Sequence, residues 1–134
     1  MLSPVPFRRW RHVLEHVLFV QKVRPGKRDL YVEAHRDPPA DLLRVLRDSG
    51  VKREIIWLQG ENIYIYVMSD EFDKAIADQG KSRVFQDWVQ RMTPLLSEIQ
   101  DFSGEGTVVR LPKVFDLEEQ LERIGALPPA EKIR

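Results

Sequence analysis

The sequence predicts an α+β fold with the element order β, α, β, β, α, β. A hairpin signature lies in the middle of the chain, and a strand-like run and helically spaced apolar residues occur on each side of it. The 134 residues suffice for one domain, because folding at about this length buries roughly two-thirds of the unfolded chain's surface. We therefore expect a single main domain with its own hydrophobic core.

The first predicted strand and helix occupy residues 16–50. Residues 16–23, HVLFVQKV, end at an Arg-Pro-Gly turn signal and are typical of a buried strand. The apolar residues that follow have helical spacing up to Gly50, a residue type common just past a helix end. The double proline at 38–39 breaks this helix, because proline lacks the N–H and disfavours a helical conformation in the preceding residue. Asp37 is the predicted N-cap of the second helical segment.

The second half of the chain contains a predicted hairpin, then a helical region and then a last strand. Residues 54–68 contain two β-branched and aromatic runs, separated by Gln-Gly-Glu-Asn at 59–62, which is a hairpin signature. Residues 71–99 predict a helical region that is broken near Gly80. The run TVVRLPKVF at 107–115 predicts the last strand, and its proline favours an edge position or a bulge.

This element order matches the split βαβ, or ferredoxin-like, pattern, with an antiparallel sheet and both helical regions on one face. We assign this domain to residues 16–117, between an N-terminal arm at 1–15 and a short helix with a frayed tail at 118–134. The runs VLFV and IYIYV are apolar at adjacent positions, so the other sheet face needs a cover. This predicts a homodimer that packs sheet against sheet.

Composition argues against several classes of function. The 21 Lys and Arg residues balance 21 Asp and Glu residues, which disfavours a nucleic-acid partner bound mainly by counterion release. The chain has no cysteine, which removes disulfides and thiolate catalysis and fits a reducing cytosol. The apolar run HVLFV is too short to span a membrane. We expect a cytoplasmic protein with no membrane or nucleic-acid partner.

One short motif resembles a metal site. His12, Glu15 and His16 fit the H-x-x-E-H pattern, in which two histidines one helical turn apart share a zinc ion. The match lies in the N-terminal arm, continues directly into the first predicted strand, and leaves one other histidine in the chain. A match of this length has little specificity, so we predict no metal site.

Tyr31 and His35 are the best candidates for chemistry. They lie four residues apart and share one helical face, and Trp88 of the second helical region can join them. Such a pair is often a half-buried packing contact. Histidine, however, has an ordinary pKa of about 6.5 and exchanges protons near neutrality. The double proline at 38–39 opens space beside His35, so the sequence favours a pocket there.

From about Val17 to Leu117 the chain resembles the L-rhamnose mutarotase family, small dimeric proteins with a ferredoxin-like α/β barrel. The order and spacing of several short motifs agree along this whole range. The matching segments are FVQKVRPG, the Y-x-x-x-H of Tyr31 and His35, LLRVLRDSGV, Asn62 before the second hairpin strand, QDWVQRM around Trp88, and the Val-Phe pair at 114–115.

The resemblance implies an activity and a set of site residues. It implies an isomerase of carbohydrate metabolism that interconverts the α and β anomers of a deoxyhexose such as L-rhamnose, without metal or cofactor. His35 matches the histidine that is the family's proposed proton donor, and Tyr31 and Trp88 match sugar-binding residues. Val89 matches the second of two adjacent tryptophans that bind the substrate.

The chain departs from the family pattern at three positions. Pro39 stands where the family has a tryptophan, Val89 replaces the second tryptophan, and Glu54 replaces a substrate-contacting tyrosine. Two other readings therefore stay open: a non-catalytic sugar- or metabolite-binding dimer, and a ferredoxin-like monooxygenase, which has only the fold in its favour. In the mutarotase reading, His35 protonates the ring oxygen while a second polar group or a water acts as base.

Overall fold

The computed structural model describes residues 14–126, and it divides into two compact units. The main unit, Glu15–Leu111, contains the sheet and most helices, and the other unit includes the helix α6 (Leu117–Arg123). The elements of the main unit are β1 (Glu15–Val23), α2 (Arg28–Arg36), α3 (Ala40–Asp48), β2 (Val51–Gln59), β3 (Asn62–Ser69), α4 (Phe72–Gly80), α5 (Arg83–Met92), the 3-10 turn η1 (Thr93–Leu95) and β4 (Leu96–Glu98).

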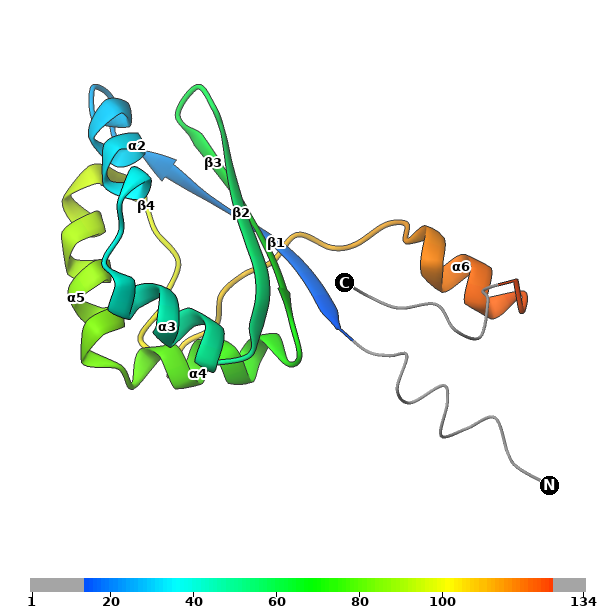
Figure 1. Cartoon of the computed structure of the whole chain (residues 1–134). Coiled ribbons are helices and arrows are strands. Elements are labelled where there is room, and N and C mark those ends of the chain that lie inside the picture. The colour runs from blue at the N-terminus through cyan, green and yellow to red at the C-terminus, as the bar shows by residue number, and fades with distance from the viewer. Residues whose placement is uncertain (1–13, 127–134) are drawn as a thin grey trace. The chain divides into compact units, whose positions relative to one another are not determined.

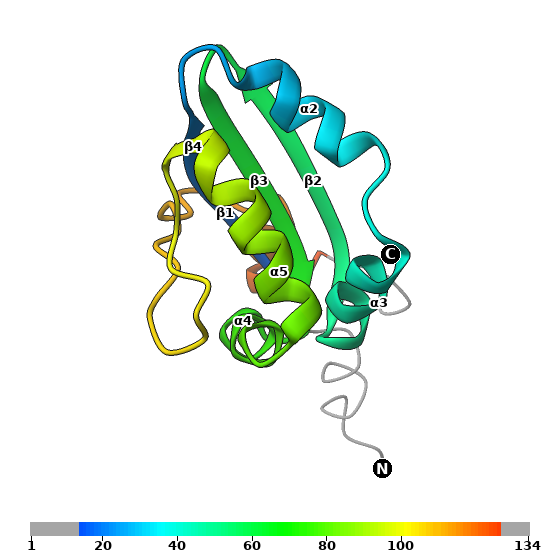
Figure 2. The ribbon, with the colours of Figure 1, turned by 90° about the vertical axis from the view of Figure 1, so that its left-hand side faces the viewer.

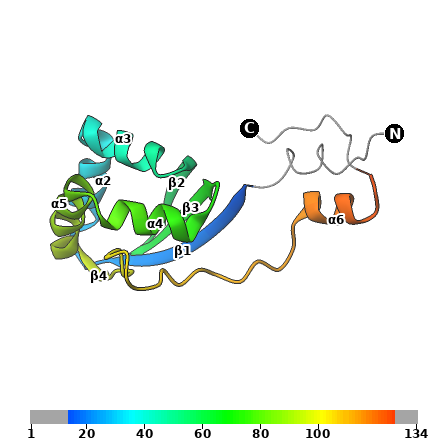
Figure 3. The ribbon, with the colours of Figure 1, turned by 90° about the horizontal axis from the view of Figure 1, so that it is seen from below.

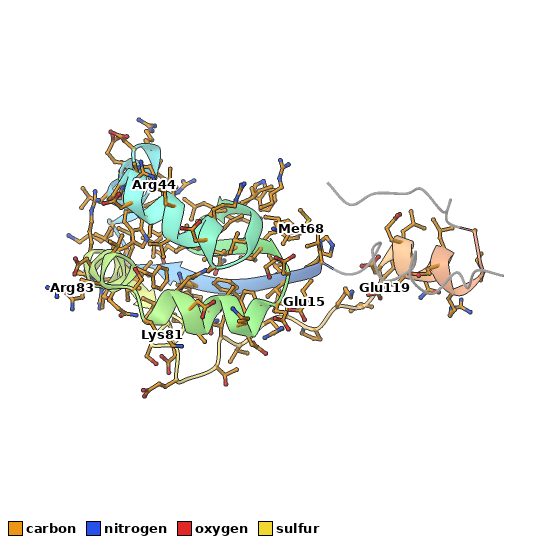
Figure 4. All side chains as sticks on the ribbon, turned by 60° about the horizontal axis from the view of Figure 1, so that its bottom comes forward. Glu15, Arg44, Met68, Lys81, Arg83 and Glu119 are labelled. Carbon is orange, nitrogen blue, oxygen red and sulfur yellow. The ribbon has the colours of Figure 1, made fainter. Side chains whose placement is uncertain are left out.

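The four strands form one antiparallel sheet in the order β2-β3-β1-β4 (Figure 1). Strand β1 pairs with β3 along its length, so Glu15 lies opposite Ser69 and Lys22 lies opposite Asn62. Figure 4 shows Glu15 and Met68 at the same end of the sheet, as this register requires. The predicted α+β, ferredoxin-like fold class is confirmed.

The helices α2 to α5 lie on one side of the sheet (Figures 1 and 2). The strand residues that face them alternate with outward-facing residues, as the period of a strand dictates. The fully buried core includes Val23 and Ile63 from the sheet and Phe72 and Ala75 from α4. This core holds the helical layer against the sheet, and the candidate site lies in the same layer.

The predicted break at the double proline is confirmed, but its details differ. Helix α2 ends at Arg36 and α3 begins at Ala40. Pro39, with an extended backbone (ψ 137°), is the residue that precedes α3. Asp37 follows the end of α2 and makes no capping bond to α3, so the N-cap prediction is wrong. The residue before a proline avoids the helical region, which keeps both 37 and 38 outside the second helix.

The predicted last strand at 107–115 is wrong: the fourth strand is the short β4, inside the region predicted as helix. The side-chain amide of Gln100 makes hydrogen bonds where a paired strand would make backbone hydrogen bonds. Its Nε2 donates to the carbonyl oxygen of Val20 (3.1 Å), and its Oε1 accepts from the backbone N–H of Val109 (2.9 Å). The N–H of Leu111 then donates to the carbonyl of Leu18 (2.8 Å). The chain after β4 therefore lies beside β1 at Gln100 and again at Leu111 without a regular ladder (Figure 3), whereas Ser103 and Gly104 between them lie close to Gly80 at the end of α4.

The sheet face opposite the helices carries apolar and aromatic side chains. Trp57 on β2 is 53% exposed, and its strand neighbour opposite is Tyr64 on β3. On the same face His16 stacks against Tyr66 and its Nδ1 lies 2.6 Å from the Tyr66 hydroxyl. The homodimer through this face stays a prediction.

The remaining predictions concern the chain ends. The helix α6 begins after Asp116, whose side chain accepts a hydrogen bond from the N–H of Glu119 (3.1 Å), as N-caps do. Residues 1–13, with most of the predicted arm and His12 of the H-x-x-E-H match, and residues 127–134 of the predicted tail lie outside the described part. Within residues 14–126, no helix is long and apolar enough to cross a membrane.

Candidate active site

A cavity of about 310 Å³ lies between the helical layer and the sheet. This volume is at the lower end of the roughly 300–1,000 Å³ found for small-molecule sites, so it suits a monosaccharide better than a longer sugar chain. Most of its lining is apolar. The polar side chains that line it are Gln21, Tyr31, His35, Glu54 and Gln79.

The structure brings all four predicted site residues to this one cavity. Tyr31 and His35 come from α2, and Trp88 and Val89 come from α5. The rings of Tyr31 and His35 are 4.2 Å apart, and the His35 and Trp88 rings meet edge to face at 5.2 Å. Three aromatic rings from two helices therefore form one continuous wall.

The helix break shapes this cavity. Pro38 is among the lining residues, whereas Pro39 is not. Because α2 stops at Arg36 and α3 restarts at Ala40, the segment between them bends instead of covering His35 with another helical turn. Pro39 therefore does not supply the wall that a tryptophan forms at this position in the family pattern.

His35 is held in one tautomer. Its Nδ1 lies 2.7 Å from the backbone carbonyl oxygen of Tyr31. A carbonyl oxygen can only accept, so Nδ1 carries the proton and donates it. In the neutral ring Nε2 then has a free lone pair, and it has no hydrogen-bond partner among residues 14–126. The side chain thus offers one unpaired basic nitrogen in the cavity.

The surroundings of His35 favour this neutral form. Partial burial lowers the pKa of His35 below its ordinary 6.5, the hydrogen bond to the Tyr31 carbonyl opposes this effect, and the positive charge of Arg91 adds to the lowering. The Arg91 guanidinium lies 5.2 Å from the Trp88 ring centre, a cation–π distance. Near neutral pH, His35 is therefore a base that is ready to accept a proton at Nε2.

Tyr31 is a neutral hydroxyl group under all ordinary conditions. Its side chain is only 3% exposed. Burial raises the pKa of Tyr31 well above its usual range, and the nearby negative charge of Glu54 raises this pKa further. The phenol can therefore donate or accept a hydrogen bond but does not act as a phenolate.

Glu54 also lines the cavity, although the sequence marks this position only as a departure from the family pattern. The residue lies on the edge strand β2, where the pairing with β3 shifts by a bulge between Val51 and Arg53. Val51 and Glu54 consequently line the same cavity although they are three positions apart. In a regular strand such residues point to opposite faces.

The Glu54 carboxyl is both reachable by water and surrounded by protein. Its side chain is exposed, because it extends from an edge strand into a cavity that solvent can enter. The neighbouring protein atoms still displace much of its hydration, and this desolvation raises the pKa of Glu54 from 4.5 to about 7. The sequence signal for this position is the alternation of Glu54 with Ile56 and Leu58, which places a charged residue on the apolar face of β2.

The described residues give no support for a metal. Within residues 14–126, no group of three or more His, Cys, Asp or Glu side chains could hold an ion. Glu15 and His16 of the H-x-x-E-H match lie in a strand, where Glu15 accepts a hydrogen bond from the N–H of Phe72 and His16 contacts Tyr66. The side chains that line the cavity offer proton exchange, hydrogen bonding and an aromatic surface.

These features agree with the comparison to known proteins. The sequence matches the family described as L-rhamnose mutarotase over residues 16–117. The fold is similar to the crystal structure of an L-rhamnose mutarotase from Formosa agariphila, with a TM-score of 0.62 at 18% identity, covering 76% of this chain and 97% of that chain. A search among curated protein sequences gives no significant match. Because the family match spans most of the chain, the protein belongs to the L-rhamnose mutarotase family and so to the carbohydrate isomerases.

Proposed function

We propose that the protein interconverts the α and β anomers of a deoxyhexose such as L-rhamnose, with His35 exchanging the protons. The observation that carries this proposal is the unpaired Nε2 of His35 in a cavity it shares with Tyr31 and Trp88. The family membership supplies the reaction class. The arrangement supplies a proton-exchanging group whose Nε2 is free to accept a proton, and general acid–base catalysis requires such a group.

The reaction needs one proton removed and one proton added. Ring opening takes the proton from the anomeric hydroxyl at C1, forms the C1 carbonyl, and breaks the bond from C1 to the ring oxygen, which must be protonated. Rotation about the C1–C2 bond and reclosure on the other face then give the second anomer. Since both directions use the same groups, each group alternates between acid and base.

The other site residues bind the sugar in this proposal. The Trp88 ring covers the apolar face of the pyranose and excludes water, and Val89 beside it adds apolar contact. Tyr31 donates a hydrogen bond to a sugar hydroxyl, since its phenol stays protonated. Because Val89 and Pro39 replace two aromatic residues of the family pattern, Trp88 carries most of the stacking.

We also propose a cytoplasmic homodimer that forms through the open sheet face. The exposed Trp57 and its neighbours Tyr64 and Tyr66 supply an apolar surface on β2 and β3. Large exposed apolar surfaces of this kind commonly mark association sites. A second copy of the chain would bury the same surface on both subunits, as two-fold symmetric interfaces do.

The first test is magnetisation-exchange NMR between the α and β anomers of L-rhamnose, L-fucose and common D-sugars. We expect the wild-type protein to accelerate exchange for a deoxyhexose and His35→Ala to lose most of this acceleration, because general acid–base catalysis by one residue is worth about 10²- to 10⁴-fold. Arg36→Ala is the matched control: Arg36 follows His35 on α2 but is exposed and pairs with Glu33.

Three other results would each contradict part of the proposed function. A His35→Ala variant as fast as the wild type would remove His35 from the site. Sugar binding without any acceleration by the wild type would identify a binding protein instead of an enzyme. Stoichiometric haem uptake with no effect on any sugar would favour a monooxygenase.

A further inference from the structure

We propose that Glu54 is a second catalytic residue, which protonates the ring oxygen while Nε2 of His35 removes the proton from the anomeric hydroxyl. This inference rests on the mutarotation proposed above and assigns the acid and the base of the ring-opening step. Glu54 stands where the family pattern has a tyrosine, so the assignment concerns this chain in particular.

His35 and Glu54 share one cavity. His35 reaches the cavity from α2 and Glu54 reaches it from the edge strand β2. Tyr31 lies near both groups, because its ring centre is 4.2 Å from that of His35 and the negative charge of Glu54 raises the pKa of its phenol. A sugar in this cavity therefore has an imidazole and a carboxyl group available from two different elements.

Glu54 has no structural partner in the part of the chain that the structure describes. Among residues 14–126, its carboxylate makes no hydrogen bond or ion pair, and burial alone sets its pKa. Arginines are nearby, since Arg44, Arg47 and Arg53 line an adjoining depression together with Glu54. Arg44 instead pairs with Asp41 at 2.6 Å. A glutamate kept for a surface ion pair would use one of these cations.

Strand β2 directs Glu54 into the cavity. Glu54 pairs with Val67 of β3 on the face that turns toward the helices, and the bulge between Val51 and Arg53 brings Val51 to the same cavity. Bulges of this kind are common next to active sites. The same face continues with Ile56 and Leu58, which pack against the core, so the carboxyl group enters an otherwise apolar wall.

The protonation states agree with this assignment. The charged or titratable groups that face Glu54 are Tyr31 and His35 from α2, Arg44, Arg47 and Asp48 from α3, and Arg53 on its own strand. Desolvation raises the pKa of Glu54 to about 7, whereas the pKa of His35 is lowered. Because these two pKa values shift in opposite directions, Glu54 is suited to donate a proton and His35 is suited to accept one.

The step balances without a further reactant. The Glu54 carboxylic acid gives its proton to the ring oxygen as the electron pair of the C1–O5 bond moves to that oxygen. The Nε2 of His35 takes the anomeric hydroxyl proton, and that O–H electron pair forms the C1 carbonyl. Reclosure returns the O5 proton to the carboxylate and the imidazolium proton to the new anomeric oxygen. Both residues regain their starting states.

The test compares Glu54→Gln with the wild type in anomer exchange of L-rhamnose, measured from about pH 5 to about pH 9. Glutamine keeps the size and hydrogen bonding of the side chain but cannot transfer the proton. We expect kcat to fall about 10²- to 10⁴-fold while KM changes little. The wild-type rate should fall as pH rises through about 7, the pKa of Glu54, and this alkaline limb should be absent from the variant.

Two further variants make the comparison specific. Glu61→Gln is the control, because Glu61 is an exposed glutamate in the hairpin turn, and it should keep the wild-type rate and pH profile. Glu54→Asp keeps a carboxyl group and should recover part of kcat, which also tests the site if the glutamine variant does not fold. The alkaline limb should persist in this aspartate variant.

The outcomes separate this inference from the function on which it rests. A wild type that accelerates no sugar overturns the mutarotation, and the role of Glu54 with it. An active wild type with an equally fast Glu54→Gln variant and an unchanged alkaline limb overturns the role of Glu54 alone. A variant that loses sugar binding with unchanged kcat assigns Glu54 to binding and also overturns its catalytic role.

Discussion

Replacing Glu54 by glutamine is expected to stabilise the protein above neutral pH. Burial raises the pKa of Glu54 from 4.5 to about 7, so the folded state holds this proton more strongly than the unfolded state. The contribution of Glu54 to stability is therefore greatest below about pH 4.5 and declines as pH rises to about 7. Above that pH the folded protein carries a poorly solvated charge, which glutamine removes.

The size of the stabilisation follows from the pKa shift of Glu54, reduced because solvent screens the charge. Each pKa unit corresponds to about 1.4 kcal/mol, so the whole shift of the Glu54 pKa would amount to about 3–4 kcal/mol. The Glu54 side chain is exposed to solvent through the cavity, and screening reduces the value to about 1 kcal/mol. For a chain of this size that gain corresponds to a Tm increase of about 4 °C.

The assay is thermal unfolding of the wild type, Glu54→Gln and the control Glu61→Gln at about pH 5 and about pH 8. We expect the Tm advantage of Glu54→Gln at the higher pH to shrink strongly at the lower pH, and no comparable change for Glu61→Gln. An equal Tm difference at both pH values, or a lower Tm than the wild type at about pH 8, would refute the reasoning. A stabilising but inactivating change is the expected signature of a functional residue.

The remaining predictions concern packing and assembly. Gly80→Ala should lower the free energy of unfolding by about 1–3 kcal/mol, because an added Cβ would lie 2.5 Å from the backbone oxygen of Ser103 and 2.7 Å from Cα of Gly104; a wild-type midpoint in urea would contradict this. Trp57→Asp should convert the proposed dimer to monomers in sedimentation, because Trp57 is 53% exposed on the open sheet face; a wild type that is already monomeric would refute the interface.

Much of the fold could be predicted because its signals are local. The hairpin turn at 59–62 and the helix break at 38–39 depend on residues that are neighbours in the chain. The strand predicted at 107–115 could not be corrected in this way. Its β-branched residues favour a strand, but the Gln100 side-chain amide bonds to Val20 and Val109 where ladder bonds would form. Gln100 and Val20 are 80 positions apart in the chain, so a local sequence pattern cannot show that they are in contact.

The candidate site shows the same limit. The spacing of Tyr31 and His35 on one helix places them on one face, so the sequence could group them. Alternation with Ile56 and Leu58 places Glu54 on the core-facing side of β2, but it could not be grouped with Tyr31 and His35, because no local pattern shows which part of the helical layer lies opposite it. The bulge before Glu54 places Val51 on that same side, and bulges follow from strand pairing in three dimensions.

The hydrogen bonds of the Gln100 side chain to Val20 and Val109 affect the order in which the chain folds. Strand β1 is synthesised first, but its partner β3 begins at Asn62 and its other edge is completed only by Gln100 and Leu111. The hairpin of β2 and β3 can form from local contacts, whereas β1 must wait for long loops to close, which is slow. During synthesis the outer edge of β1 thus stays open until almost the whole domain has left the ribosome, and this nascent strand is the segment most in need of protection from aggregation.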